Sequence, residues 1–380
     1  MMIPFNKPFI AGKELFYISR AVLEGNLAGN GRFTKSCQKW MEDNFGSKKV
    51  LLTNSCTAAL EMSALLCNVG PEDEVIMPSF TFVSTANAFA LRGAKIRFVD
   101  IRPDTLNIDE NHIEAAITKK TKVIVPVHYA GVGCEMDRIM EIARHYHLTV
   151  IEDAAQGVQS TYKNRFLGTI GNLGAYSFHE TKNIISGEGG ALLINDDCFI
   201  ERAEIIRDKG TNRRNFLRGE VDKYSWVDLG SSFLPSELVA AFLYAQLEQI
   251  EAITRKRLQI VDYYHQHLSL LQEKGLIRLP VCPSHCRHNS HMFYILVSGN
   301  QEIRDKLLAH LQLKGVWAVF HYIPLHTSPM GKKTGRTIPD LPVTDDLSAR
   351  LLRLPCYFEI TREEQDKTIA EIYKFFRNMK

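Results

Sequence analysis

Short runs of apolar and β-branched residues alternate with segments of helical spacing through the first two thirds of the chain. The strand-like runs lie at 50–53, 74–77, 95–100, 123–127, 149–153, 175–178 and 191–194. The spacing of apolar residues between them predicts helices over 58–67, 84–91, 113–117 and 136–146. Strands joined by crossover helices form a largely parallel sheet that is covered on both faces. The pattern therefore predicts an α/β domain.

The pattern changes beyond about residue 245. A long helical stretch over 238–267 is followed by a loop rich in Pro and Cys, a strand at 292–297 and a helix near 303–313. This order predicts a smaller α+β domain. We therefore expect a large domain at residues 1–245 and a small C-terminal domain at residues 246–380.

The composition is that of an ordinary globular chain. Of 380 residues, 45% are apolar and 23% are charged, and the formal net charge is +3. This balance does not favour a nucleic-acid partner. No apolar run approaches the length of about 20 residues that a membrane-spanning helix needs, and the N-terminal residues lack the apolar core of a signal peptide. We expect a cytoplasmic protein that binds neither nucleic acid nor membrane.

The eight cysteines are consistent with a cytoplasmic location. Most stand alone inside apolar segments, where a cysteine usually behaves as a small buried apolar residue. Segment 282–291 differs, since it holds five potential zinc ligands: Cys282, His285, Cys286, His288 and His291. Structural zinc usually joins two pairs of ligands across a loop, and no second pair follows at a suitable spacing. We therefore interpret the segment as a loop and expect no bound metal.

Polar residues follow the predicted strands at their carboxyl ends, where open α/β sheets bind ligands. Segment 53–57 ends a strand and begins a helix, whose free amides suit a phosphate. The alternative is that Asn54 or Ser55 only caps that helix. A second strand ends in Glu152 and Asp153, and a buried carboxylate needs a cation or several hydrogen bonds. Such a carboxylate is also typical of a cap or a metal ligand.

A third strand is followed by Lys182 and then by the glycine-rich turn 187–190. A desolvated lysine is a nucleophile toward carbonyls, whereas an isolated lysine is usually a solvated surface group. Taken together, these signals match the three groups through which proteins bind pyridoxal 5'-phosphate (PLP). The lysine would bind its aldehyde, the carboxylate its ring nitrogen and the helix N-terminus its phosphate.

On these residues the chain resembles the PLP aminotransferases of the sugar-nucleotide (DegT and DnrJ) family. The resemblance runs from Ile3 to Pro355, and its most specific segments are 78–87, 126–131, 152–156, 177–183 and 320–326. It implies the fold-type I PLP-dependent transferase fold, with a large mixed, mostly parallel sheet. It also implies a homodimer with active sites at the interface.

The resemblance assigns roles to individual residues. Lys182 would bind the cofactor covalently and move the proton, and Asp153 would pair with the ring nitrogen. Gln156 would approach the ring hydroxyl, and Phe82 would stack on the ring. The phosphate would be held by the amide of Cys56 and the hydroxyls of Thr57 and Ser177, and the substrate would lie near Phe33, His321 and Tyr322.

One position departs from the family pattern. Many relatives carry an asparagine that reaches the phosphate of the neighbouring subunit, and here Ser232 takes its place. The shorter side chain puts a direct contact in doubt, although water could bridge the gap. We keep Ser232 as a candidate cofactor residue.

The implied reaction has two halves. L-Glutamate would donate its amine to PLP, and the amine form would then aminate a dTDP-linked 4-keto-6-deoxyhexose. The sequence does not distinguish this enzyme from a sister 3-aminotransferase or a UDP-sugar 4-aminotransferase.

Three other classes of protein fit less well. A sugar dehydratase of the same fold works without the lysine, and a non-catalytic regulator would tolerate loss of Lys182 or Asp153. A nucleotide-sugar dehydrogenase or epimerase needs a G-x-G-x-x-G turn, which neither 29–31 nor 131–133 forms.

Overall fold

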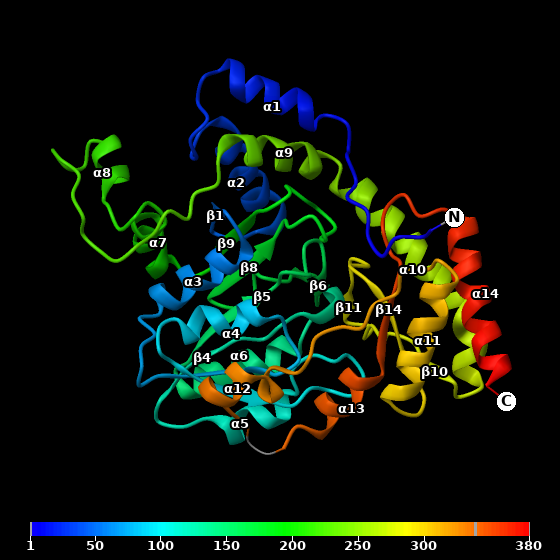
Figure 1. Cartoon of the computed structure of the whole chain (residues 1–380). Coiled ribbons are helices and arrows are strands. Elements are labelled where there is room, and N and C mark those ends of the chain that lie inside the picture. The colour runs from blue at the N-terminus through cyan, green and yellow to red at the C-terminus, as the bar shows by residue number, and fades with distance from the viewer. Residues whose placement is uncertain (1, 338–339, 380) are drawn as a thin grey trace.

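The computed structural model describes residues 2–337 and 340–379. Its centre is an eight-stranded sheet in the order β1-β9-β8-β5-β4-β2-β3-β13 (Figure 1). Strand β9 runs antiparallel to both of its neighbours, and every other neighbouring pair is parallel. The strands are β1 (Lys49–Thr53), β2 (Glu74–Pro78), β3 (Lys95–Val99), β4 (Thr121–Ile124), β5 (Thr149–Asp153), β8 (Leu173–Ser177), β9 (Gly190–Ile194) and β13 (Gly335–Thr337). The predicted mixed, mostly parallel α/β sheet is confirmed.

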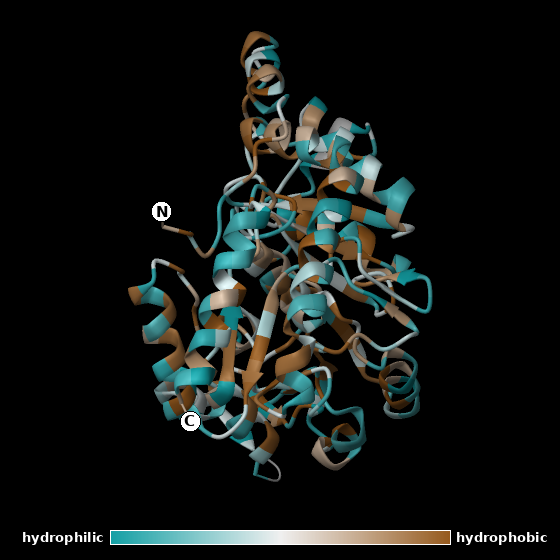
Figure 2. Ribbon diagram, turned by 90° about the vertical axis from the view of Figure 1, so that its right-hand side faces the viewer, coloured by the Kyte–Doolittle hydropathy of each residue, from teal (hydrophilic) through white to brown (hydrophobic). Residues whose placement is uncertain are grey.

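Helices cover both faces of this sheet, because the side chains of each strand alternate between two apolar clusters. In β1, Val50 and Leu52 belong to one cluster and Leu51 belongs to the other. The first cluster includes residues of α2 (Arg32–Phe45), α6 (Met136–Tyr146) and α9 (Glu237–Glu248). The second includes residues of α3 (Cys56–Leu66), α4 (Val83–Ala90) and α7 (Ile200–Arg207). Figure 2 shows the apolar residues gathered on the central strands.

The C-terminal part has its own antiparallel sheet, β10-β12-β14, and its own apolar cluster. Its strands are β10 (Ile277–Arg278), β12 (Phe293–Val297) and β14 (Leu351–Leu354). They pack against α10 (Ile250–Glu273), α11 (Gln301–Leu313) and α14 (Arg362–Asn378), which lie together in Figure 1. The expected single helix over 238–267 is wrong. It is two helices, α9 and α10, which meet at Gln249, where the backbone leaves helical geometry (ψ 9°).

Two strands from beyond residue 246 pair with strands from the first part of the chain. Strand β13 extends the large sheet at its edge beside β3, and β11 (Cys286–Arg287) pairs with β6 (Thr161–Tyr162), which pairs with β7 (Arg165–Phe166). The domain boundary at residue 245 therefore stays a prediction, and strands β11 and β13 from beyond it pair with strands that precede it. The remaining helices are α1 (Glu14–Leu23), α5 (Ile113–Ala116), α8 (Arg213–Leu217), α12 (Pro329–Thr334) and α13 (Pro342–Arg350). Over the ranges that the structure describes, every helix is too short or too polar to cross a membrane.

Candidate active site

A cavity of about 650 Å³ lies between the carboxyl end of the large sheet and the C-terminal part. Strands β5 and β8 contribute their last residues, Asp153 and Ser177, and the turn after β8 contributes Lys182. The C-terminal part contributes segment 320–322 and residues of β14. Nine of the predicted site residues line this cavity: Cys56, Thr57, Phe82, Asp153, Gln156, Ser177, Lys182, His321 and Tyr322.

The first turn of α3 forms one wall of the cavity. Ser55 caps the helix by accepting a hydrogen bond from the amide of Ala58 at 3.0 Å. A Cβ atom at Gly190 would lie 2.4 Å from the backbone nitrogen of Cys56, so only glycine allows β9 to approach the helix start this closely. Thr57 Oγ1 donates to Ser84 Oγ at 2.7 Å. Burial raises the pKa of the Cys56 thiol well above its ordinary value, so this sulfur is a neutral part of the wall.

The two carboxylates at the end of β5 point in opposite directions, as neighbouring residues of a strand must. Asp153 faces the cavity, where its Oδ2 accepts a hydrogen bond from Thr85 Oγ1 at 2.6 Å and its Oδ1 accepts one from the amide of Ala155 at 3.1 Å. Glu152 is fully buried on the other side. Of these two neighbouring carboxylates, Asp153 is therefore the one available to a ligand in the cavity.

Lys182 lines the cavity and is half-buried there. Burial lowers the pKa of its amine, the charge of Arg353 lowers it further, and the charge of Asp153 opposes this change. Within residues 2–337 and 340–379, no group accepts a hydrogen bond from its Nζ atom. The site thus holds an amine that is shifted toward its neutral, nucleophilic form.

Gln156 and Tyr322 form a second wall. The side-chain oxygen of Gln156 accepts from the amide of Ala130 at 2.7 Å, and its Nε2 donates to the hydroxyl of Tyr322 at 3.0 Å. Because that hydroxyl accepts from Gln156, its own proton is available to another acceptor. The ring of Tyr322 stacks on His321 at a centroid distance of 3.6 Å, and His321 Nδ1 bonds the hydroxyl of Tyr129 at 2.7 Å.

Two predicted site residues do not line the cavity. Phe33 is 3% exposed in α2, where its ring lies 5.4 Å from that of Tyr17. Ser232 lies beside the start of α3, where its backbone oxygen accepts a hydrogen bond from Asn54 Nδ2 at 3.2 Å. Both were expected to act near a subunit interface, and their roles stay predictions.

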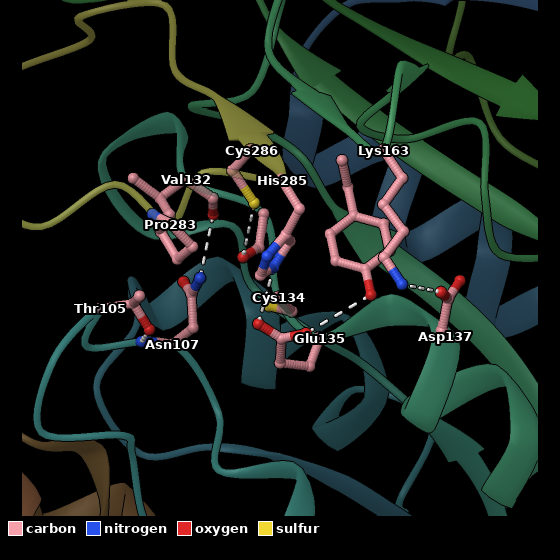
Figure 3. A network of polar contacts seen from close by, with 12 residues as sticks. Thr105, Asn107, Val132, Cys134, Glu135, Asp137, Lys163, Pro283, His285 and Cys286 are labelled. Atoms are coloured by element: carbon pink, nitrogen blue, oxygen red, sulfur yellow. Dashed lines mark hydrogen bonds and ion pairs between the residues drawn. The ribbon is translucent and has the colours of Figure 1, made fainter.

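Segment 282–291 directs its side chains to different partners (Figure 3). His285 Nε2 lies 2.9 Å from Glu135 Oε1, and Cys286 Sγ donates to the backbone oxygen of Gly133 at 3.8 Å. These contacts hold β11 against the loop before α6. His291 belongs to the cavity instead, and its Nδ1 lies 3.1 Å from Asn183 Oδ1.

Three residues that were not predicted as part of this site also line the cavity: Thr85, His291 and Arg353. Thr85 and His291 have no local signal that relates them to Asp153 or Lys182. Arg353 has one, because it is the only charged residue in the four-residue strand β14. A cation within an apolar strand faces either solvent or a polar site, and here it faces the site.

The profile of the DegT/DnrJ/EryC1/StrS aminotransferase family matches residues 10–373. The spore coat polysaccharide biosynthesis protein SpsC of Bacillus subtilis is 32% identical over 377 residues, which are 97% of this chain and 96% of that protein. GDP-perosamine synthase of Caulobacter vibrioides is 32% identical over 370 residues, with 96% of each chain covered. A putative sugar aminotransferase of Streptococcus pneumoniae, solved in its PLP form, has a TM-score of 0.91 at 25% identity and covers 100% of this chain and 99% of that one.

Proposed function

Because the chain belongs to the DegT/DnrJ/EryC1/StrS aminotransferase family, we propose that it transfers the amine of L-glutamate to a nucleotide-linked keto sugar. The acceptor is dTDP-4-dehydro-6-deoxy-D-glucose, and the product is dTDP-4-amino-4,6-dideoxy-D-galactose, a sugar of surface polysaccharides such as enterobacterial common antigen. The observation that carries the proposal is the single cavity lined by the shifted amine of Lys182 and the carboxylate of Asp153.

The cofactor is PLP, and the cavity fits it. Lys182 has an Nζ atom without a hydrogen-bond partner among the described residues, which leaves it free to bind the aldehyde. Asp153 offers a carboxylate to the ring nitrogen, and the first turn of α3 offers amides to the phosphate, with the hydroxyls of Thr57 and Ser177 beside it. Bound there, PLP supplies an electron sink for the carbon that gains or loses the amine.

The residues of the chain prepare this chemistry. Lys182 moves the proton between the substrate and cofactor carbons, a task for which a lowered pKa suits its amine. Thr85 and the amide of Ala155 fix the carboxylate of Asp153 against the ring nitrogen. Gln156 and Tyr322 present donors to the ring hydroxyl, and Phe82 covers a ring face.

A homodimer with active sites at the interface completes the proposal. Large apolar side chains that are exposed on α1 and at Trp226 support the homodimer, because monomeric proteins rarely expose large apolar patches to water. On α1, Leu15 and Leu23 are 79% and 82% exposed, and Trp226 is 76% exposed. Ser232 and Phe33 lie in the same part of the chain, near α3 and α1, which agrees with their expected place at an interface.

Product analysis by NMR tests the proposal. We expect the purified protein, given L-glutamate and dTDP-4-dehydro-6-deoxy-D-glucose, to form a 4-amino sugar with the amine axial. Lys182→Ala is the matched control and should form none. The UDP- and GDP-linked keto sugars serve as competing acceptors. A 3-amino product, or amination of only the UDP- or GDP-linked sugar, would assign the chain to a sister enzyme.

A further inference from the structure

His291 is a buried histidine of the cavity wall whose ring forms a hydrogen bond on one side only. Its Nδ1 atom lies 3.1 Å from Asn183 Oδ1, and Asn183 directly follows Lys182. The ring therefore lies beside the segment that carries the lysine, and His291 and Lys182 both line the cavity. Its Nε2 atom has no hydrogen-bond partner in the part of the chain that the structure describes, residues 2–337 and 340–379.

The hydrogen bonds of Asn183 determine which nitrogen of His291 carries the proton. Asn183 Nδ2 donates to the backbone oxygen of Asn289 at 2.8 Å, and a carbonyl oxygen only accepts. The amide oxygen of Asn183 is therefore the atom that faces His291, and it also only accepts, so Nδ1 of the ring is the donor. Burial lowers the pKa of His291 well below its ordinary value, which keeps the ring neutral. A neutral ring with a proton on Nδ1 has a lone pair on Nε2.

The backbone around His291 is held by hydrogen bonds to two other elements. The amide of His291 donates to Asn289 Oδ1 at 3.0 Å, and Asn289 Nδ2 donates to the backbone oxygen of Gln156 at 2.8 Å. Arg257 of α10 donates to the backbone oxygen of His291 at 2.6 Å. These bonds join the loop before β12 to the loop after β5 and to α10. The lone pair of Nε2 is thus oriented before a ligand binds.

An acceptor atom without a partner selects the kind of ligand group that binds it. A lone pair repels the oxygens of carboxylates and phosphates, so the group that binds Nε2 has to be a donor. L-Glutamate offers only its amine, which is consumed in the reaction, whereas a keto sugar offers hydroxyls. In the proposed acceptor, the keto carbon C4 has one neighbouring hydroxyl, on C3, because C5 carries the methyl group and the ring oxygen.

We propose that Nε2 of His291 accepts a hydrogen bond from the C3 hydroxyl of the keto sugar and so selects acceptors with a hydroxyl next to the keto carbon. This inference rests on the proposed function, which supplies the acceptor. A site built to bond a hydroxyl rejects the analogue that lacks it, because the buried acceptor is then left without a partner.

The proposed acceptor and its 3-deoxy analogue test the assignment, because they differ only in the C3 hydroxyl. The holoenzyme is first converted to its amine form with L-glutamate, and the return of the PLP absorbance then reports the rate with each sugar in a single turnover. We expect the wild type to prefer the hydroxylated sugar and His291→Asn to lower this preference about tenfold, the effect of leaving one polar group unpaired. Asparagine keeps a donor for Asn183 but has no acceptor at the position of Nε2. His291→Gln reaches that position with an acceptor and should recover part of the preference.

His285→Asn is the matched control, because His285 belongs to the same segment but bonds Glu135 and does not line the cavity. It should keep the wild-type preference. If His291→Asn lowered the rates with both sugars alike, the ring would not recognise the hydroxyl, and the assignment would be wrong. If the wild-type amine form fails to aminate the hydroxylated sugar, the proposed function itself is wrong. If it aminates that sugar and His291→Asn keeps the preference, the inference alone is wrong.

The protonation of the ring can be measured without turnover. In holoenzyme labelled with ¹⁵N-histidine, NMR distinguishes protonated from unprotonated ring nitrogens, and the signals that disappear in His291→Asn are those of His291. We expect a protonated Nδ1 and an unprotonated Nε2, whose signal shifts when the hydroxylated sugar binds and shifts less with the 3-deoxy analogue. A proton on Nε2 would make this atom a donor and would overturn the assignment.

Discussion

Thr85 donates a hydrogen bond of 2.6 Å from its Oγ1 atom to Oδ2 of Asp153. Thr85 lies in α4, the crossover that follows β2, whereas Asp153 ends β5, so two separate segments build one carboxylate site. The hydroxyl of Thr81 bonds that of Thr85 in turn, at 2.8 Å. The carboxylate of Asp153 is thereby oriented before any ligand binds.

We predict that Thr85→Val lowers the rate of the glutamate half-reaction about tenfold, the effect of one hydrogen bond to a charged group. Valine has the shape of threonine but no hydroxyl, so Asp153 loses a donor and its fixed orientation. Single-turnover absorbance of the cofactor measures the rate. Thr81→Val is the control, because it keeps the bond between Thr85 and Asp153. Equal losses in the two variants would show that packing, and not this hydrogen bond, determines the rate.

The pH dependence of cofactor attachment follows from the surroundings of Lys182. Burial lowers the pKa of its amine below the ordinary lysine value of 10.5, so the neutral, reactive form persists at lower pH than in an exposed lysine. Asp153 raises this pKa and Arg353 lowers it. We predict that the rate at which PLP binds the cofactor-free apoprotein rises with pH around a midpoint below 10.5.

Two variants should move that midpoint in opposite directions. Asp153→Asn removes the negative charge and should shift it to lower pH, and Arg353→Gln removes the positive charge and should shift it to higher pH. Stopped-flow absorbance measures both. A shift of the same sign in both variants would mean that these charges do not control the amine.

Gly190 provides a test of the phosphate site. A methyl group there would lie 2.4 Å from the nitrogen of Cys56 and 2.4 Å from the carbonyl carbon of Ser55, and both of these atoms belong to backbone that cannot move aside cheaply. We predict that Gly190→Ala displaces the first turn of α3 and weakens PLP binding at least tenfold, while binding of pyridoxal, which lacks the phosphate, changes little. Gly70→Ala is the control, since its added carbon would meet only Asp73 Oδ2 at 3.9 Å. Equal weakening of PLP and pyridoxal would place the phosphate elsewhere.

The sequence predicted the α/β sheet because each central strand is a continuous apolar run that two helix layers bury. It did not predict β13, because the segment Gly335–Thr337 has no apolar pattern and becomes a strand only by pairing with β3. It also missed the break at Gln249, since apolar spacing continues across it from α9 into α10. Pairing and helix direction are tertiary properties that local pattern does not encode.

The site residues likewise divide into those that local sequence pattern predicts and those that only the tertiary arrangement reveals. Lys182 and Asp153 follow strands, so their positions could be predicted from strand ends alone. Thr85, His291 and Arg353 reach the cavity from a helix, a loop and a second sheet, and no spacing in the sequence relates them to it. Their roles require the three-dimensional arrangement.

Glu152 gives a last prediction, which contrasts it with its neighbour Asp153. Glu152 is fully buried and accepts hydrogen bonds from the amides of Gly168, Ile170 and Gly171 at 2.8, 2.6 and 2.6 Å. It also bonds His128 Nε2 at 2.8 Å. Because His128 Nδ1 accepts from the amide of Cys134, its Nε2 is the protonated nitrogen and donates to Glu152. Four donors therefore surround one carboxylate.

We predict that Glu152→Gln lowers the free energy of unfolding by about 3 kcal/mol, because an amide group would face donors with its own N–H groups. Asp153→Asn should leave stability nearly unchanged and abolish most transamination, since Asp153 faces the cavity. Urea denaturation of the two apoproteins, followed by circular dichroism, measures the first effect, and single-turnover absorbance measures the second. Glu72→Gln, at an exposed carboxylate, is the control for stability. If Glu152→Gln were as stable as wild type, the four hydrogen bonds to Glu152 would not be holding the turn at 168–171 to β5.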